Sequence, residues 1–568
     1  MTELEVHRWI DRWTFFLNHN KPPLLTHRVN NHECLELNSL NSFHKPVLQH
    51  PAGFENLRLG AGDPCRLSAS ELHRAFRRGD YSAVEILAAF RRRNEDCREL
   101  NALVFPCWDK AEQQAKQLDE RRARGEPLGE LAGVPITVKD CFALSGTPST
   151  MGLRYRAAMR DQHDAPLVAA LRGADALLIG KSNVPQLMIL HEADNPLYGK
   201  SLHPLDPRRS PGGSSGGEAA LISSYCSAGG LGTDLGGSIR FPAHSCGIMG
   251  LKPTGRRLNA GGMFGNFSGQ HELRVVPGPM ARTVEDLDLL MRVWLGPKSE
   301  RAMEQPPVPW SGYRDVSLKG KRIAWWSEAE DFQVAPAIRR AVEMARDALR
   351  DAGAELIPWQ PPRLNEVLDL YFSLLSADGG AGFRILLRDE EIDYRVQKLL
   401  HFARLSSPFR WLATFWQREF QSPRLGRILA EAGPRSGRSL WELQAKTWKY
   451  RHDFWRQFTA QRFDALLFPP HALPAFTHGA SEYLAFAAGS CYLANLLDWP
   501  AGVVPVTRVQ PGEESDRKAG DLLDAQARHV EQGSAGLPVG IQVCTPPYSE
   551  PLNLAIMSAV ERAMPCLP

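Results

Sequence analysis

Hydrophobic and polar positions alternate along this chain in a repeated strand–helix pattern. A β-branched run at 134–138 predicts a buried strand, and 164–180 predicts a helix followed by a second strand. Residues 321–325 and 355–357 predict two more strands, joined by an amphipathic helix over 336–352. The apolar stripe of that helix comprises Ile338, Ala341, Ala345, Leu349 and Ala352. This alternation predicts an α/β fold with a largely parallel sheet.

Local signals also predict where helices begin and where later strands lie. Residues 68–71 and 82–85 both fit the capping box, in which a serine and a glutamate three residues later bond to the first turn. Gly79 between them is a typical helix end. Residues 463–468 and 503–506 are predicted to be later strands of the same sheet.

The candidate chemistry lies in two glycine-rich runs and one lysine. Ser214 lies in the run 210–218, Ser238 lies in the run 232–240, and Lys139 closes the strand at 134–138. Serine is a weak nucleophile until a neighbouring base takes its proton. Lysine can be that base only if burial lowers its pKa, and the end of a buried strand is suited to this. Together the three residues predict an acyl-transfer site that needs neither histidine nor metal.

Other interpretations of the glycine runs are a nucleophile elbow, a phosphate-binding loop and a flexible turn. Residues 212–216 fit the nucleophile elbow G-x-S-x-G, but that elbow follows a strand directly, whereas prolines and arginines precede this one. No Lys-Ser/Thr pair follows the glycines, so a phosphate-binding loop is not completed. Either run alone would be interpreted as a flexible turn. Both runs together with Lys139 favour catalysis.

These motifs resemble the amidase signature family, and within it the fatty acid amide hydrolase branch. The similarity extends from about residue 68 to about residue 563. The resemblance implies one large domain, residues 61–568, with a mixed, twisted β-sheet covered by helices on both faces. Residues 1–60 do not fit it and are expected to be an N-terminal extension that is partly disordered. Further segments that carry the resemblance are 183–186, 230–242, 247–255, 278–282, 497–506 and 536–539.

The resemblance also implies roles for individual residues. Ser238 is the expected nucleophile, Ser214 the proton relay and Lys139 the base, with Ser215 as the rival for the relay. The Gly213–Ser214 peptide is expected to be cis. The oxyanion hole is assigned to the backbone amides of Leu235, Gly236, Gly237 and Ser238.

Five neighbouring residues are expected to lie around these groups. Met188 matches a position that lines the substrate site in the resembled branch, although taken alone it would be interpreted as core. Asp234 and Arg240 flank the nucleophile, where a salt bridge that holds the loop is at least as good an interpretation as catalysis. Thr233 is counted with them as a supporting residue. Asp140 beside the lysine is expected to point to the opposite face of the strand.

The segment 396–425 mixes aromatic residues with lysine and arginine, and Ser406-Ser407-Pro408 is expected to break it into two short helices. Such a stripe ordinarily packs on the protein's own core. The segment nevertheless aligns with the membrane-associating cap of the resembled branch, and its composition is typical of an interfacial helix. The residues expected on one face are Phe409, Leu412, Ala413, Trp416 and Phe420.

Composition restricts the remaining alternatives. The net charge of +3 with dispersed arginines gives no indication of nucleic acid binding. The ten cysteines are scattered and indicate reduced thiols, and no motif predicts a metal or cofactor. Neither a signal peptide nor a transmembrane helix is expected, which predicts a cytoplasmic or peripheral membrane location. The oligomeric state stays open, with a homodimer among the alternatives.

The leading hypothesis is a serine amidase that hydrolyses fatty acid amides, of the N-acylethanolamine or primary amide type, to fatty acid and amine or ammonia. An amidase or esterase of short or aryl amides is the alternative within enzymes. The amidase subunit of a tRNA-dependent amidotransferase is a third reading, disfavoured by the segment 396–425 and by the lack of a basic tail. A catalytically dead lipid-binding or scaffold protein is the fourth, disfavoured by the intact set of Lys139, Ser214 and Ser238.

Overall fold

The computed structural model describes residues 60, 62–265, 269–297, 299–329, 332–405, 407–518 and 520–564. By its internal contacts the chain separates into residues 1–53 and 54–568, and every described residue belongs to the second unit. The predicted extension, residues 1–60, therefore lies outside the described residues except for Gly60. No helix among the described residues is both long and apolar enough to cross a bilayer.

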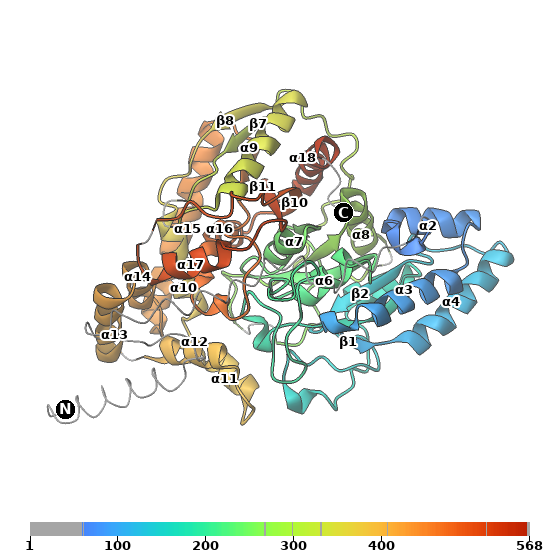
Figure 1. The fold of residues 1–568 in the computed structure, drawn as a ribbon, viewed down its shortest axis with the longest axis horizontal. Coiled ribbons are helices and arrows are strands. Elements are labelled where there is room, and N and C mark those ends of the chain that lie inside the picture. The colour runs from blue at the N-terminus through green and yellow to red at the C-terminus, as the bar shows by residue number, and fades with distance from the viewer. Residues whose placement is uncertain are drawn as a thin grey trace, which may run out of the picture. The chain divides into compact units, whose positions relative to one another are not determined.

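A single 11-stranded sheet forms the centre of the described unit (Figure 1). Its strand order is β1-β3-β2-β4-β6-β5-β10-β11-β9-β7-β8. The strands are β1 (Leu103–Pro106), β2 (Pro135–Lys139), β3 (Leu177–Ser182), β4 (Gly229–Asp234), β5 (Met249–Lys252), β6 (Val276–Ala281), β7 (Arg322–Trp325), β8 (Glu355–Pro358), β9 (Ala465–Phe468), β10 (Ala501–Arg508) and β11 (Pro538–Cys544).

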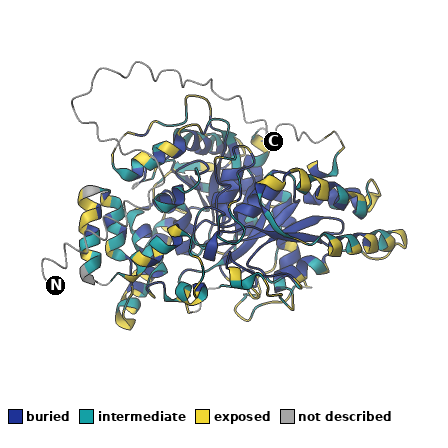
Figure 2. Ribbon diagram, turned by 60° about the horizontal axis from the view of Figure 1, so that its bottom comes forward, coloured by how far each residue is buried: buried dark blue, intermediate teal, exposed yellow. Residues whose placement is uncertain are grey.

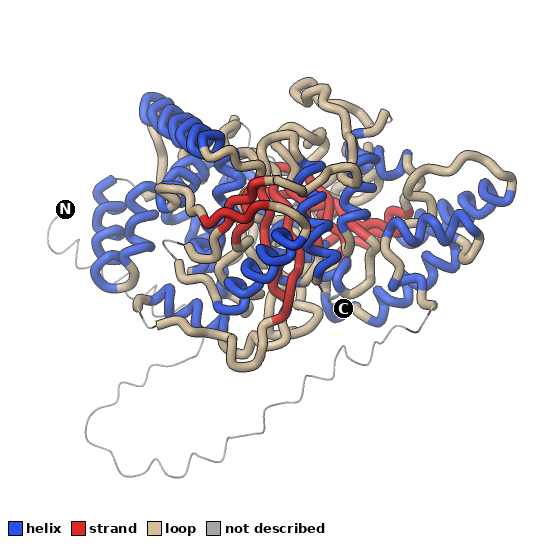
Figure 3. The backbone as a smooth tube through the Cα atoms, turned by 90° about the horizontal axis from the view of Figure 1, so that it is seen from above, coloured by secondary structure: helices blue, strands red, loops and turns tan. Residues whose placement is uncertain are grey.

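Helices surround this sheet, which is seen from above in Figure 3. The α-helices are α2 (Ala69–Arg78), α3 (Ala83–Asp96), α4 (Trp108–Ala123), α5 (Pro166–Gly173), α6 (Gly216–Ser223), α7 (Arg240–Cys246), α8 (Val284–Leu295), α9 (Pro336–Asp351), α10 (Asn365–Leu375), α11 (Ala381–Leu387), α12 (Tyr394–Arg404), α13 (Ser407–Phe420), α14 (Pro423–Glu431), α15 (Gly437–Ala460), α16 (Gly489–Leu497), α17 (Leu522–Glu531) and α18 (Glu550–Ala563). Short 3-10 helices are η1 (Pro64–Arg66), η2 (Arg98–Leu100), η3 (Arg154–Arg156), η4 (Gln186–Met188), η5 (Ala480–Glu482) and η6 (Leu484–Ala488).

Helices cover both faces of the sheet, as strand β10 shows. Successive residues of a strand point to opposite faces. Val503 packs in one apolar cluster with α6 and α7, whereas a Cβ at the adjacent Gly502 would meet Met557 of α18. The deepest burial therefore lies along the sheet, where both faces are covered (Figure 2).

The local predictions are confirmed, and the prediction of a largely parallel sheet is wrong. Both capping boxes are formed, and Gly79 ends α2 in the left-handed conformation. Parallel pairing is confined to β2 with β3 and β4, and to β7 with β8 and β9. The central strands pair antiparallel because β6 inserts between β4 and β5, so the sheet is mixed. In α9 the predicted stripe is buried except for Ala352, which is exposed as the C-cap residue.

Candidate active site

Lys139 ends β2, a strand that pairs with β3 on one side and β4 on the other. Its side chain is fully buried, and Nζ donates to Oγ of Ser214 at 2.8 Å and to Oγ1 of Thr233 at 2.8 Å. Burial lowers the pKa of Lys139 to about 8, because the charged ammonium loses its hydration. The lysine is therefore able to exchange a proton near neutral pH.

Three carboxylates oppose this shift, those of Asp234, Glu218 and Asp140, and each is bonded to other groups. Asp140 turns away from Lys139, and its Oδ2 accepts from the hydroxyl and the amide of Thr150 at 2.9 Å each. Glu218, on α6, accepts from the hydroxyls of Thr137 at 2.6 Å and Ser182 at 2.7 Å. Burial raises the pKa of Glu218 to about 7, which weakens its hold on a lysine proton.

The first glycine run is a loop that leads into α6 and holds Ser214 at 2% exposure. The Gly213–Ser214 peptide is cis, as the resemblance implied. A Cβ at Gly213 would meet the backbone N of Glu192 at 2.5 Å, so the loop packs too closely for any side chain there. Ser215 has a different partner from Ser214: its hydroxyl donates to the carbonyl of Thr233 at 3.3 Å.

The second glycine run connects β4 to α7 and carries Ser238, which is 7% exposed. The amide of Ser215 donates to the carbonyl of Ser238 at 3.1 Å, which brings the two serine loops together. Gly237 has a φ of +100°, a conformation that side chains rarely adopt. A Cβ on Gly236 would collide with Oη of Tyr371, so that position is also restricted to glycine.

Asp234 and Arg240 form a buried ion pair that holds this loop. Oδ1 of Asp234 accepts from the amide of Gly237 at 2.9 Å, and its Oδ2 accepts from the amide of Ile239 at 3.1 Å. The adjacent guanidinium holds the pKa of Asp234 well below its usual range. Asn495 donates to Oδ1 of Asp234 at 2.9 Å. These contacts support the prediction that the pair holds the loop.

The remaining predicted residues lie beside this loop. Met188 belongs to η4 and is half-buried against the core. Three residues later, Nε2 of His191 lies 3.0 Å from the carbonyl O of Gly236, which brings the Met188 segment next to the second run. Leu235 is half-buried, and its carbonyl accepts from Oη of Tyr371 at 3.4 Å.

Sequence reasoning missed His191, Tyr371 and Asn495, which contact the second run from three other segments. None of them lies in a motif or at a characteristic spacing. Only the folded chain brings them together: Tyr371 and Leu235 are 136 residues apart.

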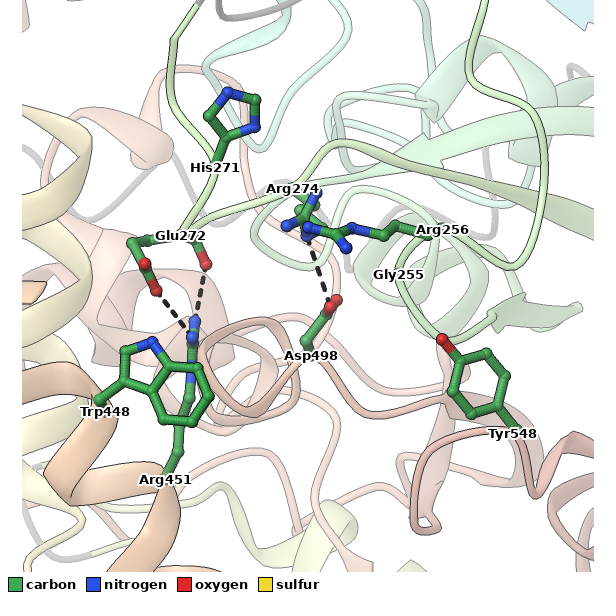
Figure 4. Close-up of a pocket in the computed structure, with 9 residues that line it drawn as sticks. All are labelled: Gly255, Arg256, His271, Glu272, Arg274, Trp448, Arg451, Asp498 and Tyr548. Carbon is green, nitrogen blue, oxygen red and sulfur yellow. Dashed lines mark hydrogen bonds and ion pairs between the residues drawn. The ribbon is translucent and has the colours of Figure 1, made fainter. Parts of the chain in front are cut away.

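One cavity of the protein is lined by other residues than these (Figure 4). It encloses about 370 Å³, and no predicted site residue lines it. Its charged groups are paired with carboxylates: Arg451 bonds to Glu272 at 2.7 Å, Arg274 lies 3.6 Å from Asp498, and Arg256 lies 3.2 Å from Glu304. This pairing leaves it little net charge with which to recruit an ionic ligand.

The segment 396–425 forms the greater part of α12, all of α13 and the start of α14. The predicted division into separate helices is confirmed, but α13 already begins at Ser407, inside the predicted break. Of the face predicted from helical spacing, Phe409, Leu412 and Ala413 are half-buried, whereas Trp416 is exposed. The other exposed aromatic residues of α13, Trp411 and Phe415, lie outside that predicted face. Trp411 is 70% exposed, and Phe415 and Trp416 are about half exposed. Among the described side chains of α13, the buried ones are the polar Thr414 and Gln417. The Phe420 side chain lies outside the described residues.

The basic residues of the same segment bind mainly within the protein. Lys398 pairs with Glu482, and Arg424 pairs with Asp521. Arg410 donates to the carbonyl of Ala432. On α13 itself Arg418 is exposed, so the outer surface of this helix carries aromatic side chains beside an exposed arginine.

The family model described as Amidase matches this chain over residues 85–554. The mixed sheet and the buried contact between Lys139 and Ser214 are consistent with that match. The chain belongs to this family and is an amide-hydrolysing enzyme. It is 37% identical over 443 residues to the fatty-acid amide hydrolase 1 of Sus scrofa, covering 77% of this chain and 76% of the relative. It is also 28% identical to an acetamidase of Aspergillus oryzae, over 88% of this chain and 89% of the relative.

A solved structure of a fatty acid amide hydrolase has the same fold. It superimposes with a TM-score of 0.75 and 24% identity, and covers 90% of this chain and 88% of that chain.

Proposed function

We propose that this protein is a serine amidase that hydrolyses fatty acid amides through an acyl-enzyme on Ser238. The observation that carries the proposal is the 2.8 Å contact between Nζ of Lys139 and Oγ of Ser214, made by a lysine whose pKa burial lowers to about 8. A neutral lysine in this place can take a proton from Ser214, which leaves Ser214 able to take one from Ser238.

Acylation then proceeds in two stages. Oγ of Ser238 attacks the amide carbonyl carbon, and its proton passes to Oγ of Ser214 while the Ser214 proton passes to Lys139. Backbone amides of the second glycine run stabilise the oxyanion that forms. When the C–N bond breaks, the proton returns from Lys139 through Ser214 to the leaving nitrogen. This return matters because an unprotonated amine is a very poor leaving group.

Deacylation repeats the same transfers with water in place of Ser238. Ser214 and Lys139 remove one proton from the water, which attacks the acyl carbon. The second oxyanion collapses, Ser238 recovers its proton, and the fatty acid leaves. No step requires a metal or a cofactor.

The choice of a long-chain substrate rests on two observations. The first is the similarity to fatty acid amide hydrolases. The second is the outer surface of α13, where Trp411, Phe415 and Trp416 are exposed. We propose that this surface rests on a membrane, where a long-chain amide resides. The competing function is hydrolysis of short amides, which the similarity to an acetamidase favours.

Two experiments test these assignments. A fluorophosphonate label followed by peptide mapping should place the covalent adduct on Ser238 in the parent protein. Ser238→Ala should abolish labelling and turnover, with an unchanged circular dichroism spectrum. Labelling that persists in Ser238→Ala and disappears in Ser214→Ala would reverse the two roles. A series of primary amides from two to twenty carbons should show kcat/KM rising with chain length, whereas a maximum at two to four carbons would favour the short-amide function.

A further inference from the structure

The peptide planes of the second glycine run are fixed by hydrogen bonds to their carbonyl oxygens. In a planar trans peptide, the carbonyl and the following N–H point in opposite directions. A donor that holds a carbonyl therefore also sets the direction of the next amide. Three consecutive carbonyls, those of Leu235, Gly236 and Gly237, each accept such a bond.

The peptide plane between Gly236 and Gly237 is held at both ends. Nε2 of His191 lies 3.0 Å from the carbonyl O of Gly236, and the amide of Gly237 at the other end donates to Oδ1 of Asp234 at 2.9 Å. The Gly237 amide is thus engaged by a buried carboxylate. This contact argues against Gly237 as a donor to an oxyanion.

The peptide planes before and after it, Leu235–Gly236 and Gly237–Ser238, are each held at the carbonyl end by one hydrogen bond. Oη of Tyr371 donates to the carbonyl of Leu235 at 3.4 Å, so the amide of Gly236 points away from Tyr371. The amide of Phe241 donates to the carbonyl of Gly237 at 2.7 Å, so the amide of Ser238 points away from the first turn of α7. These two amides flank the occupied Gly237 amide.

We propose that Tyr371 and His191 are positioning residues that build the oxyanion hole, and that its donors are the amides of Gly236 and Ser238. This inference rests on the proposed function, because it requires Ser238 to be the acylated residue. Tyr371 acts through Leu235, and His191 acts through Gly236; neither side chain needs to touch the substrate.

The surroundings of Tyr371 and His191 keep each side chain able to donate its hydrogen bond. Tyr371 is 3% exposed, and burial raises the pKa of its hydroxyl, so it stays a donor throughout the working pH range. Burial lowers the pKa of His191 to about 4, so the ring is neutral, and the tautomer with its proton on Nε2 donates to Gly236.

The chain offers a matched control for the tyrosine. Tyr492 stacks on Tyr371 with ring centroids 4.1 Å apart, and its own hydroxyl donates to the carbonyl of Ala485 at 2.9 Å. Tyr371→Phe and Tyr492→Phe each remove one buried hydroxyl from the same aromatic stack. Only Tyr371→Phe removes a bond to the second glycine run.

The test compares kcat, KM and the affinity for a trifluoromethyl ketone with a long acyl chain, which forms a hemiketal on the nucleophile and places an oxyanion in the hole. Loss of a whole oxyanion donor costs about 10²–10³ in kcat. Tyr371→Phe misdirects a donor without deleting it, and a fall in kcat of about 10- to 100-fold is expected. KM should change less than about twofold, since the bond acts on the transition state. The inhibition constant of the ketone should rise by the same factor as kcat falls.

The histidine provides a second, independent test. Gln can place an N–H donor near the position of Nε2, whereas Leu cannot. His191→Leu should therefore lose kcat and ketone affinity together, and His191→Gln should recover most of both. Tyr492→Phe should change neither.

Several results would overturn the inference. One is unchanged ketone affinity in Tyr371→Phe and His191→Leu, and another is an equal loss in Tyr492→Phe. Failure of the proposed function is distinguishable from these, because the fluorophosphonate label on the parent protein would then map to a residue other than Ser238.

Discussion

The guanidinium of Arg240 and the carboxylate of Asp234 form a bidentate ion pair that is fully buried. Nη2 lies 2.9 Å from Oδ1, Nε lies 3.0 Å from Oδ2, and both side chains have 0% exposure. The same carboxylate accepts the amides of Gly237 and Ile239, one on each side of Ser238. The pair therefore joins the last residue of β4 to the first residue of α7 and fixes the loop between them.

Removing one partner of this pair should strongly destabilise the protein. Arg240→Ala leaves a buried carboxylate without its counter-ion, and a loss of about 3–5 kcal/mol in the free energy of unfolding is expected. Urea denaturation followed by tryptophan fluorescence measures it. The control is Arg438→Ala, which breaks the exposed pair with Glu442 on α15 and should cost less than about 1 kcal/mol. Equal losses in the two variants would contradict this account of the loop.

Much of the fold, and the candidate site, could be predicted from local sequence. Strand β2, helix α9 and both capping boxes depend on residues close together in the chain, so periodicity and capping chemistry were sufficient. Lys139, Ser214 and Ser238 stood out because each lies at a strand end or in a glycine run.

The rest depends on contacts between distant segments. The insertion of β6 between β4 and β5 follows from the packing of the whole sheet, and no local pattern specifies it. His191 and Tyr371 reach the second glycine run from other elements, and buried tyrosines and histidines are common in any core. The outward aromatic face of α13 was predicted only through the resemblance, since helical spacing alone favours packing on the core.

Activity should rise with pH through the titration of Lys139. Its pKa is lowered from the usual lysine value to about 8, so the ammonium loses its proton above that pH and the neutral amine becomes able to act as a base. We expect kcat/KM to increase about tenfold per pH unit well below 8 and to level off above it. Measurements between pH 6 and 10 with a fatty acid primary amide test this.

Variants assign the inflection to a residue. Lys139→Ala should lower kcat/KM by several orders of magnitude, because removing one residue of a catalytic set that acts as a unit costs about as much as removing the set. The inflection of the pH profile near 8 should also disappear. Glu218 also titrates in this range, with a pKa raised to about 7. Glu218→Gln should keep the inflection. A profile that retains its shape in Lys139→Ala would remove the lysine from the mechanism.

Gly237 should not tolerate a side chain. A Cβ there would lie 2.7 Å from Sγ of Cys491, and its φ of +100° is strained for alanine. We expect Gly237→Ala to lower kcat by at least about 100-fold, the scale set by a lost oxyanion donor, because the strain is relieved by moving the loop. Cys491→Gly in the same chain should recover only part of the loss, since the backbone strain stays. The control is Gly173→Ala at the end of α5, where a Cβ meets nothing within 4 Å and activity should be unchanged. Full activity in Gly237→Ala would show that the loop adapts without cost.

The outer surface of α13 should bind membranes through apolar contact more than through charge. Trp411, Phe415 and Trp416 are exposed there, whereas Lys398 and Arg424 are paired with carboxylates of the protein. Flotation with phosphatidylcholine vesicles should therefore recover the parent protein, and the fraction bound should fall little between 0.1 and about 0.5 M salt, where exposed charges are screened. Changing the three aromatic residues together to Ser should abolish flotation. It should lower kcat/KM for a twenty-carbon amide in vesicles while leaving hydrolysis of a four-carbon amide unchanged.

The matched control changes Trp441, Trp448 and Trp455, which are also exposed but lie on α15. If the α15 variant loses flotation as completely as the α13 variant, exposed tryptophan in general and not this helix binds the membrane. If the α13 variant floats like the parent and keeps its long-chain activity, its aromatic residues have no role in substrate entry.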